Sequence, residues 1–483
     1  MKKRNFVMQA AITSVLLASA SAYAAVNLDA APVVPALFAK EIAFPTTPIA
    51  LTNAATILDI TVKTGYSMNA TEVRYVRLEL DNGAKFSATA TVTVAPAGGG
   101  TCSVGAVNGL GTSVIYFSLT AAGTGCNSDS VLTIVSGQSI TNTNTISVQY
   151  SMFDQPSQAQ AGGLTGRIVV KGYFPYISFG PSFSFTGAAG TAAVAGVEAT
   201  PVAFGKIQNA ASPSVPTLTQ ATLGSLDYKL VTPTPAKADG TAITLADLMK
   251  VGVSPITGTK LVVTGDFSAA GTVALPATLL PANVFLAVDA AACLAGTSAL
   301  ASVVLTATTA TFDVGATPTT ANPVLCYRVN GSTALPVTAY TASLNTVAAS
   351  TAYTVASITG AAAGNINRNG TELQAPLFQT AGSAYLSRFV LTNTSGSPAA
   401  FTINIRGETG NTITAGPTTS GTIPANGMIE VPAASVATFS GASRGFAVFS
   451  VSAPNNVIQG VHQTVNIASG AISTIVMVRP GTN

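Results

Sequence analysis

Residues 86–94 read Phe-Ser-Ala-Thr-Ala-Thr-Val-Thr-Val, and this stretch decides the fold class of the chain. Apolar residues occupy every second position, and the positions between them are Ser or Thr. A period of two places the apolar side chains on one face of a β-strand and the hydroxyl groups on the other. The same alternation returns at Ile146, Val148 and Tyr150. We therefore expect an all-β protein with little helix.

The composition excludes the classes of protein that depend on clustered charge. Of the 483 residues only 8% are charged, one is His and none is Trp. Three of the 21 basic residues lie in the leader described next, which leaves 18 basic against 18 acidic residues. A net charge of zero provides no attraction for nucleic acid. It also removes the electrostatic repulsion that keeps many secreted proteins apart.

The N-terminus has the pattern of an export signal. Lys2, Lys3 and Arg4 precede a mostly apolar run at residues 6–18, and Ala22-Tyr23-Ala24 supplies a small-x-small cleavage pattern. We expect residues 1–24 to be a signal peptide and the protein to be secreted. The apolar run is shorter than the roughly 20 residues that span a bilayer, and no later run is longer, so we expect no transmembrane segment in the mature chain.

Two breaks rich in Gly, Ala and other small residues, at residues 187–196 and 361–370, divide the remaining chain. We expect two or three tandem β-sandwiches, comprising residues 25–186, 197–360 and 371–483. The third has short alternating runs, the last of them at residues 472–478, spaced as in an immunoglobulin-like sandwich. The best helix candidate is residues 244–251, with Thr244 as N-cap and Asp247 three residues later.

The four cysteines, Cys102, Cys126, Cys293 and Cys326, form an even set in an exported chain, which favours disulfides. We expect no metal site, because the chain has no C-x-x-C motif and a single His. Three pairings are open. A faint internal repeat favours the local ones, Cys102–Cys126 and Cys293–Cys326.

The repeat rests on four features that recur in the same order. Ile-Ala-Phe at residues 42–44 returns as Val-Ala-Phe at 202–204. The strand-like residues 75–80, followed by Phe-Ser-Ala at 86–88, return as residues 260–263 and 267–269. A Cys pair and a strand with Tyr follow in each copy, at residues 148–150 and 337–340. The shared order predicts that the second domain duplicates the first, with chance similarity as the alternative.

One pattern suggests a hydrolase and fails on inspection. Residues 441–445 match G-x-S-x-G with Ser443 at the centre, and the single His462 lies downstream. A nucleophile elbow needs a strand–turn–helix setting and an acid between Ser and His, but no Asp or Glu lies between these two residues. We expect a hairpin turn at Ser443, a sheet histidine at His462, and neither enzyme activity nor a bound cofactor.

Six aromatic residues gather within residues 173–185, and they are the one concentration of a contact-forming residue type. They are Tyr173, Phe174, Tyr176, Phe179, Phe183 and Phe185. Exposed, the strip could stack on sugar rings or pack against another subunit. Buried, it would fill the interface between the first two domains, which is the interpretation that we favour.

Residues 25–44 form an extended apolar segment with Pro32 and Pro35. Such a segment can add a strand to the sheet of a neighbouring molecule. It can also be the first strand of its own domain, which the position at the start of the mature chain favours.

The signal, the Thr-, Ala- and Val-rich β-modules and the low charge resemble bacterial surface-layer and extracellular-matrix structural proteins. The resemblance implies a secreted structural protein that associates with itself, or with other matrix components, at the cell surface. The alternative is a monomeric adhesin or glycan-binding protein that uses the aromatic strip.

Overall fold

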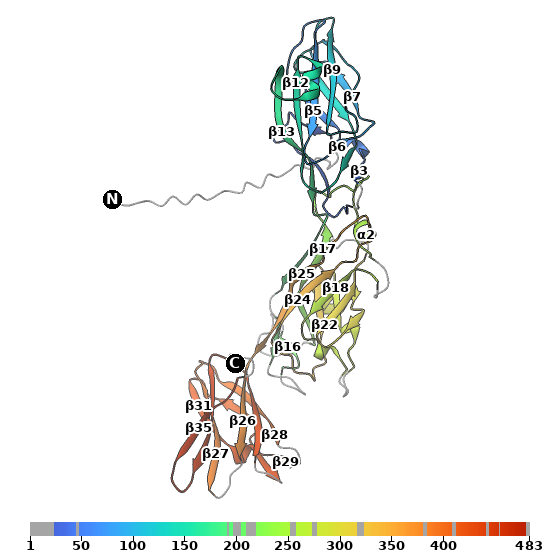
Figure 1. The fold of residues 1–483 in the computed structure, drawn as a ribbon. Coiled ribbons are helices and arrows are strands. Elements are labelled where there is room, and N and C mark those ends of the chain that lie inside the picture. Colours follow the sequence, from blue (N-terminus) through green and yellow to red (C-terminus); the bar gives the residue numbers. More distant parts are fainter. Residues whose placement is uncertain are drawn as a thin grey trace, which may run out of the picture. The chain divides into compact units, whose positions relative to one another are not determined.

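The computed structural model describes residues 24–44, 48–190, 193–196, 204–208, 219–251, 257–272, 278–315, 323–379, 384–407, 412–440, 444–453 and 455–479. The proposed signal peptide, apart from Ala24, and Ser443 lie outside these residues. The described chain contains 35 strands and four short α-helices, so the all-β prediction is confirmed (Figure 1). None of its helices is long and apolar enough to cross a membrane.

The chain forms two compact units, and each is described by itself. The first comprises residues 1–184, 229–250 and 348–355, and the second comprises residues 185–228, 251–347 and 356–483. The predicted domain 25–186 therefore gains two segments from later in the chain. Within the second unit, the last residues form a separate pair of sheets.

The first unit is a sandwich with a large sheet on one side. The large sheet has the order β2-β13-β12-β5-β9-β8, and two smaller sheets have the orders β1-β4-β10-β7 and β3-β11-β6. The strands are β1 (Val26–Asn27), β2 (Ala36–Ala39), β3 (Ile49–Leu51), β4 (Ile60–Lys63), β5 (Val73–Leu80), β6 (Lys85–Phe86), β7 (Thr91–Ala95), β8 (Thr101–Val104), β9 (Val114–Ala122), β10 (Val131–Val135), β11 (Gln138–Ile140), β12 (Ile146–Phe153) and β13 (Arg167–Gly180). Helix α1 (Pro156–Ala161) follows β12.

The stretch at residues 86–94 forms two strands instead of one. β6 ends at Phe86, β7 begins at Thr91, and the two pair with different sheets. Between them the Ser87 hydroxyl accepts a hydrogen bond from the Thr89 main-chain N–H at 2.9 Å. Ser and Thr side chains compete for main-chain donors in this way and favour turns. The alternation correctly predicted β-structure in this stretch, but it did not predict the turn between Phe86 and Thr91.

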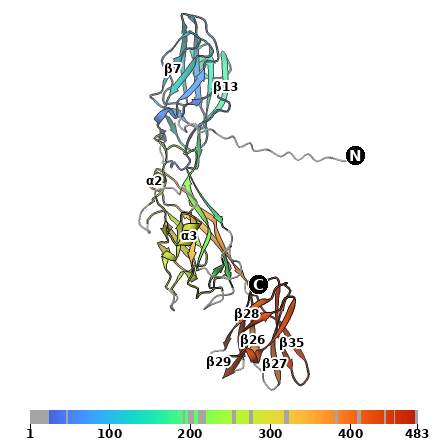
Figure 2. The ribbon, with the colours of Figure 1, turned by 180° about the vertical axis from the view of Figure 1, so that it is seen from behind.

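The second unit begins with a second pair of sheets. Their orders are β14-β17-β23-β19-β20 and β16-β15-β25-β24-β18-β22-β21. The strands are β14 (Phe183–Ala189), β15 (Ala193–Gly196), β16 (Ile207–Gln208), β17 (Gln220–Leu230), β18 (Lys260–Thr264), β19 (Val284–Ala287), β20 (Leu300–Ala301), β21 (Val304–Leu305), β22 (Thr309–Asp313), β23 (Val324–Arg328), β24 (Thr338–Asn345) and β25 (Ile358–Asn369). Helix α3 (Ala290–Ala295) follows β19 (Figure 2).

The strand orders of the two halves agree. The large sheet β2-β13-β12-β5-β9-β8 has the counterpart β15-β25-β24-β18-β22-β21, and β4-β10-β7 has the counterpart β17-β23-β19. All nine counterparts follow each other in the same chain order. Both sheets contain one parallel pair, β2 with β13 and β15 with β25, and their other pairs are antiparallel. This agreement supports the predicted duplication. We call residues 26–180 the first repeat and residues 183–369 the second repeat.

The structure corrects the predicted break at residues 361–370 and the predicted end of the helix at residues 244–251. Residues 361–370 are not a break, because all but Gly370 belong to β25, which pairs with β24 and β15. Helix α2 (Leu245–Leu248) begins at Thr244 with the predicted capping box, but ends early because Met249 is extended and forms a bridge with Ala348. A tertiary contact thus stops a helix that the local sequence would continue.

The disulfides are the two local ones. Cys102 pairs with Cys126 and Cys293 with Cys326, with Cα–Cα distances of 5.3 and 5.7 Å. Cys102 lies on β8, whereas Cys293 and Cys326 are both fully buried and belong to a core cluster with Phe285. The second bridge is therefore part of a core.

Residues 371–476 form a C-terminal sandwich. One sheet has the order β26-β33-β28-β30 and the other β31-β27-β34-β35, with β29 and β32 as a separate pair. The strands are β26 (Thr371–Gln379), β27 (Tyr385–Asn393), β28 (Ala399–Gly407), β29 (Thr412–Ala415), β30 (Ser420–Ile423), β31 (Gly427–Pro432), β32 (Ala437–Ser440), β33 (Arg444–Val451), β34 (Ile458–Asn466) and β35 (Ile472–Val476), and helix α4 (Ala433–Val436) follows β31.

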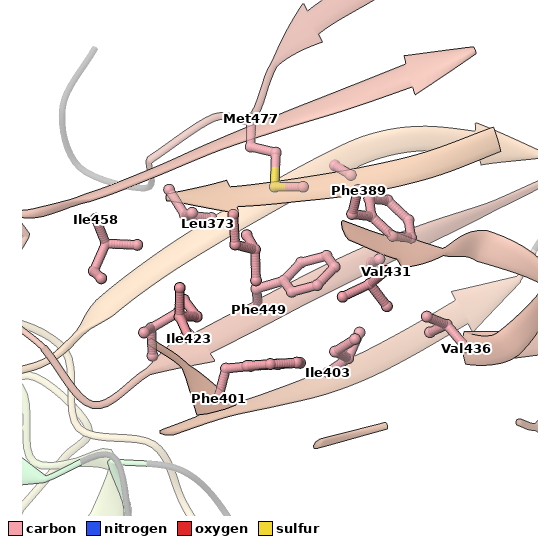
Figure 3. Close-up of a cluster of buried hydrophobic side chains, with 14 of the residues drawn as sticks. Leu373, Phe389, Phe401, Ile403, Ile423, Val431, Val436, Phe449, Ile458 and Met477 are labelled. Atoms are coloured by element: carbon pink, nitrogen blue, oxygen red, sulfur yellow. The ribbon is translucent and has the colours of Figure 1, made fainter. Parts of the chain in front are cut away.

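Side chains from both sheets of this sandwich meet in one core, in which Leu373, Phe401 and Phe449 face Phe389 and Met477 (Figure 3). The last two strands, β34 and β35, are neighbours in one sheet, and the preceding strand β33 lies in the other. Strands F, G and E of the immunoglobulin fold are distributed between its two sheets in the same way. The predicted sandwich is confirmed.

Candidate functional site

The outer face of the sheet β31-β27-β34-β35 carries apolar side chains in rows across the strands. Leu386, Val465 and Ile472 are register partners and form one row; a second row consists of Val390, Val461 and Val476. The inner face of the same sheet carries Phe389 and other members of the core, so these rows point to the opposite side. Ile472 is 55% exposed and Val476 73%. This surface, which we call the outer apolar face, is exposed within the described structure.

A polar row lies between the two apolar rows, and its groups bond to one another. Arg388 Nη1 donates to Glu430 at 2.6 Å, and Arg388 Nε donates to the side-chain oxygen of Gln463 at 2.9 Å. Gln463 Nε2 in turn donates to the Thr474 hydroxyl at 3.3 Å. The positive and the negative charge are therefore neutralised within the face. A second molecule that approaches the face meets no unbalanced charge from this row.

Strand β35 ends the sheet, and the outer edge of residues 472–476 is open; directly after them Val478 forms a bridge with Gln374 of β26. Among the described strands its one neighbour is β34. The Met477 N–H donates to the Gly460 carbonyl at 3.0 Å, and the Asn466 N–H donates to that of Ala471 at 2.9 Å. In an antiparallel ladder bonded residues alternate, so Ser473 and Ile475 bond to β34. The N–H and C=O groups of the residues between them point to the open edge.

The sequence of β35 lacks the features that normally protect an edge. It reads Ile-Ser-Thr-Ile-Val, with no charge and no Pro, and all five residues are exposed. Natural edge strands are usually kept apart by Lys, Pro, bulges or a covering segment. The alternating pattern predicted a strand at residues 472–478, but position at the edge depends on sheet order and could not be read from the pattern.

The histidine of the hydrolase pattern lies on the inner side of the same sheet. A hydrogen bond of 2.6 Å joins His462 Nε2 to Ser387 Oγ, and both side chains are buried. Burial lowers the pKa of His462, so the imidazole is neutral near pH 7. The ring packs 5.4 Å from Phe389, measured between ring centroids. This arrangement is a satisfied sheet histidine, as the sequence predicted.

The aromatic strip does not form a continuous contact surface. Tyr173 is 50% exposed, whereas Tyr176, Phe183 and Phe185 are buried and Phe174 and Phe179 are half-buried. The Tyr176 hydroxyl donates to the Leu58 carbonyl at 2.6 Å and accepts from Gln138 at 2.9 Å. Alternation along β13 and β14 places successive side chains on opposite faces, which separates the six rings. The strip is therefore corrected to one exposed ring, Tyr173.

Two further features of the described residues offer little chemistry. No group of three or more His, Cys, Asp or Glu side chains is placed to hold a metal ion. The first unit contains a cavity of about 560 Å³ whose lining includes Ile42, Phe44, Ile49 and Tyr353. Burial raises the pKa of Tyr353 to about 12, so its hydroxyl stays protonated.

The comparisons with known proteins add little. No family model matches the chain, and no curated protein matches it. Among solved structures the chain is similar to a Corynebacterium diphtheriae protein described as membrane-anchored, with 8% identity, 92% of this chain and 89% of that chain covered, and a TM-score of 0.19. A TM-score this low supports no conclusion about fold or function.

Proposed function

We propose that this protein is a secreted structural protein that associates with copies of itself at or near the cell surface. The observation that carries the proposal is the free, uncharged edge of β35 beside the outer apolar face. The predicted signal peptide and the two disulfides fit an oxidising compartment outside the cytoplasm.

The edge of β35 is complementary to itself. Two copies of the strand, arranged antiparallel about Thr474, place Ile472 of one molecule opposite Val476 of the other. Thr474 then faces Thr474 of the other copy, a favourable cross-strand pair. This is a two-fold interface that joins the two sheets into one and continues the apolar rows across both molecules. The paired Arg388 and Glu430 leave no net charge to oppose it.

The test is light scattering and electron microscopy of the protein without residues 1–24, beside the variant Thr474→Pro. The Thr474 N–H points to the open edge, so proline removes a donor needed for edge pairing and keeps the ladder with β34. We expect association of the unsubstituted protein and its loss in Thr474→Pro. The matched control, Thr474→Val, keeps the N–H and should associate. A monodisperse monomer at high concentration would contradict the proposal.

Tyr173 supports glycan binding as a second candidate function. Its ring is exposed, and Tyr173, Gln149 and Glu79 are register partners in one row across β13, β12 and β5. An aromatic ring beside amide and carboxylate groups can stack on a sugar and bond its hydroxyls. Under this function Tyr173→Ala should lose binding on a glycan array. Tyr176→Ala is unsuitable as a test, because that side chain is buried.

A further inference from the structure

Residues 26–42 fill a slot in the first unit that later parts of the chain build. β2 pairs in parallel with the end of β13, so that Phe38 lies opposite Phe179. On its other side Phe38 forms a bridge with Ala236, and Ile42 forms one with Tyr353. Three segments that are far apart in sequence thus hold one short strand. Phe38, Ala39 and Ile42 are buried there. Val26 and Leu28 are buried too, but beside β4, with which β1 pairs in parallel.

Two carboxylates fix the register of the segment. Asp29 accepts from the Lys63 main-chain N–H at 2.6 Å and forms an ion pair with Lys171. Glu41 accepts from the Ser182 hydroxyl at 2.6 Å and from its main-chain N–H at 3.2 Å. The slot therefore recognises an extended peptide with buried apolar side chains and an acidic residue on each side of β2.

The slot is complete only after much of the chain has folded. Phe38 and Phe179 are separated by 141 residues, and Glu41 and Ser182 likewise. The contact with Tyr353 spans more than twice that distance. Contacts at such separations form late, because loop closure precedes them. β1 has its partner β4 only about 34 residues away, but until these late contacts form, β2 has no partner in its own molecule.

The second repeat fills the corresponding position in a different way. Its strand β15 also pairs in parallel with the counterpart of β13, but β15 is joined to the chain at both ends. β2 closely follows the predicted signal peptide, and cleavage of that peptide after residue 24 would leave the segment tethered at one end only. A strand tethered at one end can fill the slot of another molecule with the same contacts.

We propose that residues 25–44 also bind the slot of a second copy, so that molecules are linked head to tail by exchanged N-terminal strands. This rests on the proposed self-association and adds a partner segment to it. Each molecule donates one segment and accepts another, which generates an open chain of subunits unless the arrangement closes into a ring. The exchanged state makes the same contacts as the closed state, so exchange loses none of them.

The experiment uses two variants of the protein without residues 1–24, each with one added cysteine. Leu37 on β2 and Ser178 on β13 are register partners. Protein carrying Leu37→Cys is refolded with an equal amount of differently tagged protein carrying Ser178→Cys, and the mixture is oxidised. A disulfide between the tags requires exchange. We expect its yield to exceed that of the control pair Leu37→Cys with Thr89→Cys by about tenfold, since docking raises the effective concentration.

The outcomes separate this inference from the proposed function. Tagged heterodimers at the expected yield support strand exchange. Particles or filaments in the unsubstituted protein together with background yield of heterodimer overturn the exchange and leave self-association standing. A monomer by light scattering with background yield overturns both. The double variant Leu37→Cys/Ser178→Cys, which should close the disulfide within one molecule, shows that both thiols can react.

Discussion

The two repeats share a strand order but differ in what completes them. In the first repeat the parallel strand of the large sheet comes from the N-terminal segment at residues 25–44, and the disulfide joins β8 to the loop before β10. In the second repeat an internal strand takes that position, and the disulfide lies in a core. Two repeats with the same strand order can therefore differ in the origin of their parallel strand and in the burial of their disulfide.

The same strand order is thus completed by an internal strand in the second repeat and by the N-terminal segment in the first. In the second repeat the parallel strand is internal to the chain, and the disulfide is buried. The first repeat depends on β2, whose partner β13 is distant in sequence, and on residues 229–250 and 348–355, which pack with the first unit. A repeat of this kind is suited to a contact that can be made within one molecule or between two.

The largest expected effect comes from truncating Phe38, the largest side chain that the N-terminal segment buries in the slot of the first unit. Phe38→Ala should lower the free energy of unfolding of the first repeat by about 3–5 kcal/mol, because a fully buried aromatic ring is lost. The second repeat fills its slot with Ala195 and should be unaffected. Hydrogen exchange resolved by repeat measures both, and equal loss of protection in the two repeats would break the comparison.

The disulfides come next. By the chain-entropy estimate, removing Cys293–Cys326 should cost about 3.7 kcal/mol and removing Cys102–Cys126 about 3.4 kcal/mol, so a clear difference must come from packing. The sequence separations are 33 and 24 residues, and the second bridge also packs against Phe285. Denaturant unfolding of the two Cys→Ala double variants measures the difference. A larger loss in the first repeat would contradict the distinction between a peripheral and a core bridge.

Substitution of one buried tyrosine in each repeat should destabilise both repeats by a similar amount, which tests whether the two repeats are equivalent. Tyr150 on β12 donates to the Thr64 carbonyl at 2.9 Å, and Tyr340 on the counterpart β24 donates to the Asp266 carbonyl at 2.6 Å. Burial raises the pKa of both hydroxyls, which remain protonated donors. Tyr150→Phe and Tyr340→Phe should each cost about 1–2 kcal/mol in their own repeat. Calorimetry measures the loss of stability in each variant. A loss for only one of the two substitutions would show that Tyr150 and Tyr340 do not stabilise their repeats equally.

The smallest effect distinguishes the C-terminal sandwich from both repeats. Burial lowers the pKa of His462 below its ordinary value of 6.5, so the unfolded chain binds a proton at a pH where the folded chain does not. The stability from this group is complete above pH 6.5 and falls as the pH is lowered, by at most about 1.4 kcal/mol per pH unit. Thermal unfolding between pH 7 and pH 5 should show this slope, and His462→Gln should remove it. The repeats contain no His and serve as internal controls.

Local patterns predicted the features that depend on neighbours in sequence. The alternating runs predicted β-strands. The repeat favoured the two disulfides that the structure contains, and Thr244 with Asp247 predicted where helix α2 begins. The candidate site was predicted only in part. Residues 472–478 were recognised as a strand, but their exposure was not, because alternation reports one buried face and cannot show whether a strand has one neighbour or two.

The sequence by itself determined an all-β chain of low charge, and it favoured two local disulfides and a duplicated domain, since these follow from periodicity, composition and spacing. The tertiary structure decided which strands lie at edges, which aromatic rings are buried and which distant segments enclose residues 26–42. These properties depend on pairings across hundreds of residues, as between Ile42 and Tyr353. The free energy of such pairings comes from burial and hydrogen bonds that exist only once the sheets have assembled.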